Sequence, residues 1–398
     1  MSTRIILFTG KGGAGKTVCA AATALIAAER GYRTLVISSD AAHSLADVLD
    51  AQVGPEPQEV RTNLYAQEVD LYYSMKRHWA DLREVMLLVF KFQGIERVAA
   101  EELAAIPGMG EAAALLWLDE HNQSGRYDLI VVDSAPTGET LTFLTLPQVT
   151  QWWLTRALPF QKFAFKALGA TVRTTTGIPI DRAYEQLEEM FGRLGRIHNT
   201  LVDTKISSAR IVMNPERMVI QEAKRAYTYL QMYGYGVDAA VMNRVLSDQP
   251  NENGPWQRYV DAQKGYLADV EASFDPLPVS RVPHMHEEVL GIDLLRRVAQ
   301  SLYGEDDPAR VFFSQQNYRV RSDGRAYVLE VYLPFLETGE LRADQYGDQL
   351  VIQYKNQRRS YLLPNFLKFY RKTRASVENR WLHVRFEQVD RARERDEK

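Results

Sequence analysis

The fold of this chain is decided by residues 4–40, which read RIILFTGKGGAGKTVCAAATALIAAERGYRTLVISSD. An apolar run over 4–9 leads into a glycine-rich turn, and the alanine-rich stretch after it is typical of a helix from about Lys16 to Arg30. Gly31 is placed to end that helix, and TLVISSD forms the next predicted strand. This order of strand, loop, helix and strand predicts a right-handed βαβ unit and therefore a parallel sheet.

Apolar runs of the same kind recur further along the chain. They read YDLIVVD at 127–133, ARIVMN at 209–214, VDAAVMN at 237–243 and LPVSRVP at 277–283. Helical patterns separate these runs, so we predict an α/β fold with a doubly wound, mostly parallel sheet. We assign it to residues 1–305.

The long stretch between the second strand and 127–133 has a mostly helical pattern. Apolar side chains there step by three or four residues along one predicted helix face, namely Leu71, Met75, Trp79, Leu82, Met86 and Val89. A second block at 149–170 is rich in Trp and Phe. We therefore predict an inserted helical subdomain at about 65–125 and 147–200. Its aromatic and methionine side chains either line a groove for apolar helices or simply pack the subdomain core, which is the more usual role of such stripes.

Beyond Pro308 the hydrophobic period changes from 3.6 to 2. Alternating runs joined by Ser322-Asp323-Gly324 predict a β-hairpin, and further alternating runs follow it. We predict a separate antiparallel β-sandwich at 310–390. From Arg310 onward the chain has 18 Lys/Arg and 12 Asp/Glu, against 30 and 39 before it, so the sign of the charge changes at the same junction.

Composition excludes several classes of protein. The 398 residues are 45% apolar and 25% charged, which is ordinary for a globular protein, and no apolar run is long enough for a transmembrane helix. The diffuse positive charge does not predict nucleic-acid binding. The only cysteine, Cys19, excludes an internal disulfide and a cysteine-based metal cage in one chain. With no recognisable signal peptide, we expect a cytoplasmic protein.

The glycine-rich turn predicts a nucleotide site. Residues 10–17 satisfy the pattern G-x-x-x-x-G-K-[ST], with Gly10, Lys11, Gly12, Gly13, Ala14, Gly15, Lys16 and Thr17. Its position after a strand and before a helix lets backbone N–H groups surround phosphate oxygens. Lys16 is expected to reach the β- and γ-phosphates, and the Thr17 hydroxyl to ligate Mg²⁺.

Three further charged residues are candidates for the chemistry. Lys11 is a second cation in the loop, which points to solvent in a monomer but can cross to the partner's phosphates in a dimer. Asp133 ends the strand at 127–133 and can hold Mg²⁺ through water. Asp40 ends the neighbouring strand, where it either orients the attacking water or caps the next helix.

Three motifs in this order resemble one known family. GKGGAGKT, SDAAHSLAD and DSAPTGETL are similar to the phosphate loop, switch I and switch II of the arsenical-pump and tail-anchored-protein-targeting ATPases, which are deviant-Walker P-loop dimers. The resemblance implies an ATP hydrolase that uses ATP and Mg²⁺. By position it implies that Lys11 acts across a homodimer, that Asp40 acts on the attacking water and that Asp133 is the Walker B acid. It also implies nucleotide contacts for Glu216 in NPER, Asn243 in VMNRVL and Pro283 in the loop near the base.

The departures from the family narrow the expected function. The chain lacks the C-x-x-C pair that shares zinc in eukaryotic targeting factors and the several cysteines of arsenite-pump ATPases, so no zinc is expected and metalloid activation is disfavoured. Ala41 and Glu139 depart from the usual residues of the two switches. The β-sandwich resembles the α-crystallin domain of small heat-shock proteins, with an L-x-I core after Gly347-Asp348, as in the bacterial and plastid branch of the family.

The leading functional hypothesis is an ATPase that captures or targets the transmembrane segments of client proteins, with a membrane-associated receptor as a further partner. The first alternative is an arsenite-type ATPase that docks on a membrane permease. A partitioning or positioning ATPase fits less well, because the chain ends in a β-sandwich.

Overall fold

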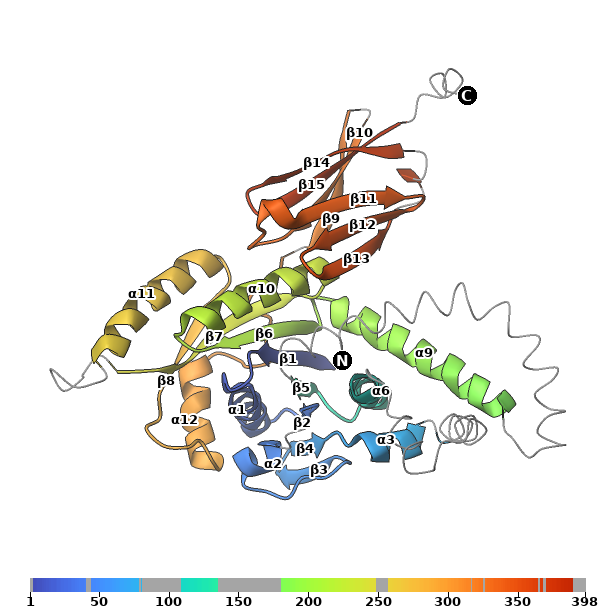
Figure 1. The fold of residues 1–398 in the computed structure, drawn as a ribbon. Coiled ribbons are helices and arrows are strands. Elements are labelled where there is room, and N and C mark those ends of the chain that lie inside the picture. Colours follow the sequence, from blue (N-terminus) through green and yellow to red (C-terminus); the bar gives the residue numbers. More distant parts are fainter. Residues whose placement is uncertain are drawn as a thin grey trace, which may run out of the picture.

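The computed structural model describes residues 3–40, 44–78, 80, 109–134, 180–247, 257–315, 317–324, 326–363, 366–367 and 370–388. It consists of an α/β part followed by two antiparallel sheets (Figure 1). Within these residues no helix is both long and apolar enough to cross a membrane.

The α/β part is built on an eight-stranded sheet with the order β3-β4-β2-β5-β1-β6-β7-β8. Its strands are β1 (Arg4–Gly10), β2 (Thr34–Ser38), β3 (Gln58–Arg61), β4 (Leu64–Glu68), β5 (Leu129–Asp133), β6 (Ser207–Met213), β7 (Val237–Val245) and β8 (Val279–Pro283). All neighbouring pairs are parallel except β3 and β4. The central strands are buried along their whole length, as parallel strands covered on both faces require. The predicted doubly wound sheet is confirmed.

Helices cover both faces of this sheet (Figure 1). Those described are α1 (Lys16–Glu29), α2 (Ser44–Leu49), α3 (Leu71–His78), α6 (Met109–Ser124), α9 (Ile180–Val202), α10 (Arg217–Tyr233), α11 (Gln257–Phe274) and α12 (Ile292–Tyr303). The alanine-rich α1 packs with α2 and α12 in one hydrophobic core, and α6, α9, α10 and α11 contribute to the core on the other face. Because successive side chains of a strand alternate, Ile6 and Phe8 of β1 enter the first core while Ile5 and Leu7 enter the second.

Two strands lie within the stretch that was predicted to be mostly helical. β3 and β4 form a short hairpin at 58–68, and β4 joins the sheet beside β2. The sequence of β3 is too short and too polar for the alternating hydrophobic pattern of a strand to be recognised. Most of the predicted helical subdomain, including 81–108 and 147–179, lies outside the described residues. Its described helices α3 and α6 bury Met75 and Trp117 in the core, each about 1% exposed.

The C-terminal part is a β-sandwich, as predicted. One sheet has the order β14-β15-β10-β9 and the other β11-β12-β13, and every strand pair is antiparallel. Leu350 and Ile352, the predicted L-x-I pair, are fully buried. The strands are β9 (Tyr318–Asp323), β10 (Ala326–Tyr332), β11 (Leu341–Tyr346), β12 (Gln349–Tyr354), β13 (Gln357–Leu362), β14 (Tyr370–Glu378) and β15 (Trp381–Gln388), with a 3₁₀ turn, η2 (Thr338–Glu340), before β11.

Candidate nucleotide-binding site

The glycine-rich loop joins the end of β1 to the start of α1. Gly10 has φ of 151°, and a Cβ atom there would lie 2.1 Å from the carbonyl oxygen of Val212 on β6. Gly13 and Gly15 have φ of 79° and 95°, which favours glycine at both positions. Gly15 is the N-cap of α1 and makes no side-chain cap, so the first N–H groups of the helix remain available to an anion.

Two side chains of the loop are placed for phosphate and metal binding. Lys16 is only 5% exposed, and its ammonium group makes no hydrogen bond or ion pair with any described residue. The Thr17 hydroxyl lies 3.3 Å from the Ser44 hydroxyl, so it is shared with the first residue of α2. Burial raises the pKa of Asp133 and the charge of Lys16 opposes that rise, but the Lys16 ammonium keeps hydrogen-bonding capacity, among the described residues, that an anionic ligand could use.

Lys11 lies at the outer turn of the loop. It is partly exposed, and its side chain makes no hydrogen bond or ion pair with the described residues, although its carbonyl accepts a hydrogen bond from the Ala14 N–H at 3.1 Å. Its ammonium is therefore available to a second molecule. Whether it crosses a dimer interface remains a prediction.

Asp133 is the most deeply buried acid of the site. It ends β5 and accepts a hydrogen bond from the Ser38 hydroxyl at 3.2 Å through Oδ2. Burial raises the pKa of Asp133 to about 6, with a further rise from the charge of Asp40, while Thr17, Lys16 and Ser38 oppose the rise. Its Oδ1 atom is buried without a hydrogen-bond partner in the described structure. An unpaired carboxylate oxygen near Thr17 fits a hydrated Mg²⁺ ion.

Asp40 lies two residues beyond the end of β2, beside Asp133. Its backbone N–H donates to the Ser38 hydroxyl at 3.3 Å, and its side chain is partly buried. The register of β2 and β5 pairs Ser38 with Asp133, so the three residues are neighbours at the carboxyl edge of the sheet. Residues 41–43, which follow Asp40 and include Ala41, and the switch II residues 135–141, which include Glu139, lie outside the described residues.

Asn243 touches the phosphate loop itself. Its Nδ2 atom donates a hydrogen bond to the Ala14 carbonyl at 2.8 Å, and a Cβ atom on Gly15 would lie 2.1 Å from the same nitrogen. The β7–β8 register shifts between Met242 and Val245, and Arg244 in that bulge has φ of 58°. Bulges of this kind redirect side chains near functional sites. The bulge aims the amide at the loop, an orientation that the sequence did not indicate.

Glu216 and Pro283 lie further along the same edge of the sheet. Glu216 is exposed and is the N-cap of α10 directly after β6, whereas Pro283 is exposed at the end of β8 opposite Val245. The structure thus brings every predicted site residue to one edge. Asn243 hydrogen-bonds to the loop backbone, whereas Glu216 and Pro283 make no hydrogen bond to the loop among the described residues, so their predicted roles stay predictions.

Two residues of this edge were missed by sequence reasoning. Ser38 links Asp133 and Asp40 through its hydroxyl. Asn214 follows β6, is only 8% exposed, and its Oδ1 atom is buried without a partner in the described structure. The signal for both was their position at the carboxyl end of a buried parallel strand, where ligands of α/β sheets bind.

Cys19 is fully buried in α1, and burial raises the pKa of its thiol to about 12. The expected small buried thiol is confirmed, and such a group is a poor nucleophile and metal ligand.

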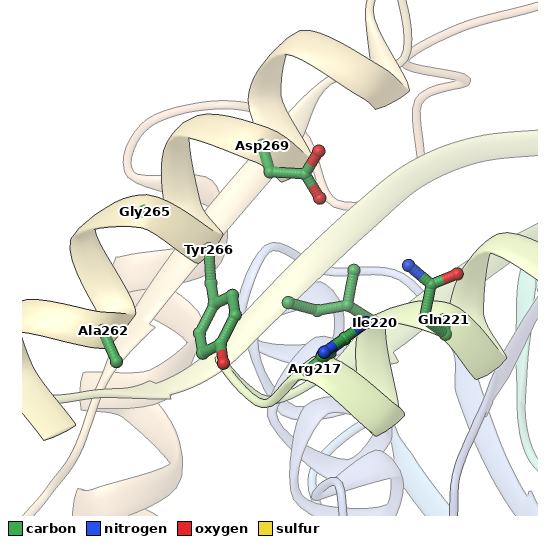
Figure 2. Close-up of a pocket in the computed structure, with 7 residues that line it drawn as sticks. All are labelled: Arg217, Ile220, Gln221, Ala262, Gly265, Tyr266 and Asp269. Carbon is green, nitrogen blue, oxygen red and sulfur yellow. The ribbon is translucent and has the colours of Figure 1, made fainter.

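A separate hollow lies between α10 and α11 (Figure 2). Its volume is about 410 Å³, and it shares no residue with the glycine-rich loop. It is lined by Arg217, Ile220, Gln221, Ala262, Gly265, Tyr266 and Asp269. This hollow is therefore distinct from the predicted nucleotide site.

Comparison with known proteins agrees with the geometry. The family model described as anion-transporting ATPase matches residues 3–304, and the model described as an HSP20-like domain found in ArsA matches residues 324–386. A provisionally named arsenical pump-driving ATPase of Chlorobaculum tepidum is 36% identical over 96% of both chains. A similarly named protein of Aquifex aeolicus is 33% identical over 94% of this chain and 98% of its own.

A more distant relative carries a different name. The protein called ATPase get3 of Pyrenophora tritici-repentis is 29% identical over 75% of this chain and 91% of its own. The aligned region has 309 residues, which is about the length of the α/β part. Taken with the phosphate loop, the sheet and the C-terminal β-sandwich, these matches show that the chain is an ATPase belonging to the anion-transporting (ArsA and Get3) ATPase family, with an HSP20-like C-terminal domain.

Proposed function

We propose that this chain is an Mg²⁺-dependent, homodimeric ATPase that couples ATP binding and hydrolysis to the capture or targeting of hydrophobic segments of membrane proteins. The observation that carries the proposal over the pump alternative is the state of Cys19. The only thiol of the chain is fully buried and its pKa is raised, so no accessible thiolate is present to bind a metalloid.

The site supports phosphoryl transfer to water. Lys16 and the N-terminus of α1 hold phosphate charge, and Thr17 with Asp133 would hold Mg²⁺, the latter through water. Mg²⁺ supplies charge neutralisation on the phosphate oxygens when bound. Asp40 orients the attacking water, and Ser38 fixes the position of Asp40 through its backbone N–H. Asn243, Glu216 and Pro283 form the nucleoside side of the site.

Dimerisation is supported by Lys11. The site already contains one buried cation, Lys16, and the partly exposed Lys11 has no partner among the described residues. A second protomer facing the loop would bring this lysine to the partner's phosphates. Sedimentation of the chain with a non-hydrolysable ATP analogue tests this part, and a monomer under those conditions would contradict it.

The client role is tested by photo-crosslinking to a transmembrane peptide. The Asp40→Asn variant with ATP should retain the peptide, whereas the nucleotide-free protein should not. A matched peptide with charged residues in its apolar segment is the control. Equal crosslinking of both peptides, or capture that ignores nucleotide, would contradict the proposal.

The pump alternative has one observation in its favour: two of the relatives matched over nearly the whole chain carry the arsenical-pump name. If this function applied to the chain, arsenite or antimonite would stimulate ATP hydrolysis. We expect no stimulation, and equal rates for the wild type and Cys19→Ala. A metalloid-dependent rise in the wild type alone would favour the pump.

A further inference from the structure

The β-sandwich is attached to the ATPase part at the C-terminal end of α10. The Met232 carbonyl of that helix accepts hydrogen bonds from the Arg359 guanidinium and from the Tyr361 hydroxyl, both on β13. The neighbouring carbonyls of Leu230 and Gln231 accept hydrogen bonds from the backbone N–H groups of Tyr235 and Gly234, in the turn that ends the helix. The sandwich therefore completes the hydrogen bonding of the helix end, and it places a cation where the helix dipole is negative.

Further contacts extend this attachment along α10. The Tyr233 hydroxyl donates to Gln357 Oε1 at 2.8 Å, and the Phe335 N–H donates to the Thr228 hydroxyl at 3.3 Å. The buried Tyr227 ring packs against rings of both parts of the molecule, namely Phe274 of α11 and Tyr332 and Phe335 of the sandwich. The interface is therefore specific and mostly buried, unlike that of a loosely tethered domain.

The opposite end of α10 lies at the nucleotide edge. The helix starts at Arg217, and its N-cap Glu216 follows β6, which pairs with the loop-bearing strand β1. The 17 residues of α10 span about 25 Å, so one rigid element joins β13 to the edge that carries the site (Figure 1).

A second connection runs along α1. The helix that starts at the phosphate loop ends at its C-cap Arg30, whose guanidinium donates to the Gly304 carbonyl at 3.0 Å and the Asp306 carbonyl at 2.5 Å. Tyr32 donates to Asp307 at 2.8 Å. These carbonyls belong to the segment that leads to the sandwich. Thus α1 and α10, which both begin at the nucleotide edge, end on contacts with the C-terminal part or its connection.

We propose that Arg359 and Tyr361 are positioning residues for the ATPase reaction, which act through α10 on the nucleotide edge. They hold the C-terminal end of the helix, and the helix in turn fixes Glu216 and the end of β6 beside the phosphate loop. In this arrangement the β-sandwich is a structural part of the ATPase site. Nucleotide binding at one end of α10 also tightens the contact at the other, because coupling between two sites is reciprocal.

Steady-state kinetics of the full-length protein test the positioning role. The variant Arg359→Gln/Tyr361→Phe removes the guanidinium and the hydroxyl that donate to Met232, while it keeps the aromatic ring and a shorter, uncharged polar side chain. We expect the KM for ATP to rise about 3- to 10-fold with kcat changed less than about 2-fold, since positioning for binding is lost and the reacting groups remain. Arg385→Gln is the matched control, because this arginine of β15 pairs only with Asp323 and Glu387 in the described structure. Arg359→Lys, which keeps the cation, should recover most of the loss.

Hydrogen exchange gives a second measurement that does not depend on a variant. In the wild type, a non-hydrolysable ATP analogue should slow exchange of the β13 amides at 357–362, and the double variant should exchange faster at the start of α10. A KM equal to that of Arg385→Gln would overturn the proposal. So would β13 exchange in the wild type that does not respond to the nucleotide. If the double variant fails to fold, Tyr361→Phe alone and the wild-type exchange decide the question.

Discussion

Replacing Asn243 with alanine should weaken the binding of inorganic triphosphate as well as that of ATP. The amide of Asn243 donates a buried hydrogen bond to the Ala14 carbonyl at 2.8 Å, and the side chain is 5% exposed. Alanine leaves that carbonyl without its partner whenever the loop adopts its phosphate-binding shape.

The size of the effect follows from the contact. An unsatisfied buried acceptor costs about 1–3 kcal/mol, and relaxation of the free loop limits the share that appears in binding to about 1–2 kcal/mol. That range corresponds to a Kd raised about 5- to 30-fold. Inorganic triphosphate lacks base and sugar, so the decrease in its affinity measures the effect on the loop alone. The affinity for ATP should decrease at least as much, and any decrease beyond that of triphosphate measures the contact of Asn243 with adenine.

The assay is competitive displacement of a fluorescent ATP analogue by ATP and by inorganic triphosphate. Asn199→Ala is the control, because this exposed asparagine lies on α9, away from the nucleotide edge, and its removal should leave triphosphate affinity within about 2-fold. If Asn243→Ala bound triphosphate as well as the wild type, the reasoning that this amide supports the loop would be refuted. Asn243 would then act on the base only.

Three other predictions concern chemistry, stability and pH. Asp40→Asn should retain ATP binding but lose most of its hydrolysis in a phosphate-release assay, and full turnover would refute its assigned role. Asp238→Asn removes the carboxylate that pairs with the buried guanidiniums of Arg4 and Arg210, so the free energy of unfolding measured by urea denaturation should fall by about 3–5 kcal/mol. The control Asp128→Asn breaks an exposed ion pair and should lower it by less than about 1 kcal/mol; equal losses in the two variants would contradict this prediction. Burial lowers the pKa values of His78 and His121 to about 4. As the pH falls through 6.5, these histidines therefore bind protons only in the unfolded state. The free energy of unfolding should decrease from pH 7.5 to pH 5 by up to roughly 2 kcal/mol per histidine. In each His→Gln variant, the free energy of unfolding should depend less steeply on pH.

The buried ion cluster behind the Asp238 prediction also connects the two parts of the chain. Asp238 is fully buried and pairs with Arg210 and Arg4 at 3.2 Å. Arg210 donates to the Pro308 carbonyl at 3.0 Å and lies over the Phe312 ring. The cluster therefore holds the start of the connecting segment against the end of the sheet opposite the nucleotide edge.

The sheet could be predicted because each of its central strands is a continuous apolar run between helical patterns. β3 and β4 could not. The four residues of β3 have mostly exposed side chains, and the five residues of β4, LYAQE, are mostly buried but do not form a continuous apolar run. In the site, the loop and the acids at strand ends were recognisable from spacing. Ser38 and Asn214 were not singled out, because Ser and Asn at strand ends are also ordinary caps and turns.

The sequence alone determined which residues reach the carboxyl edge of the sheet, because local spacing sets where each strand ends. It also determined the change from a parallel sheet to a β-sandwich, because the hydrophobic period changes after Pro308. Only the tertiary structure decided what those residues touch. The aim of Asn243 at the phosphate loop depends on a bulge between β7 and β8, and the hydrogen bonds of Arg359 and Tyr361 with α10 join residues more than 120 positions apart. Contacts of that range depend on how whole elements pack, and no local pattern of residues encodes them.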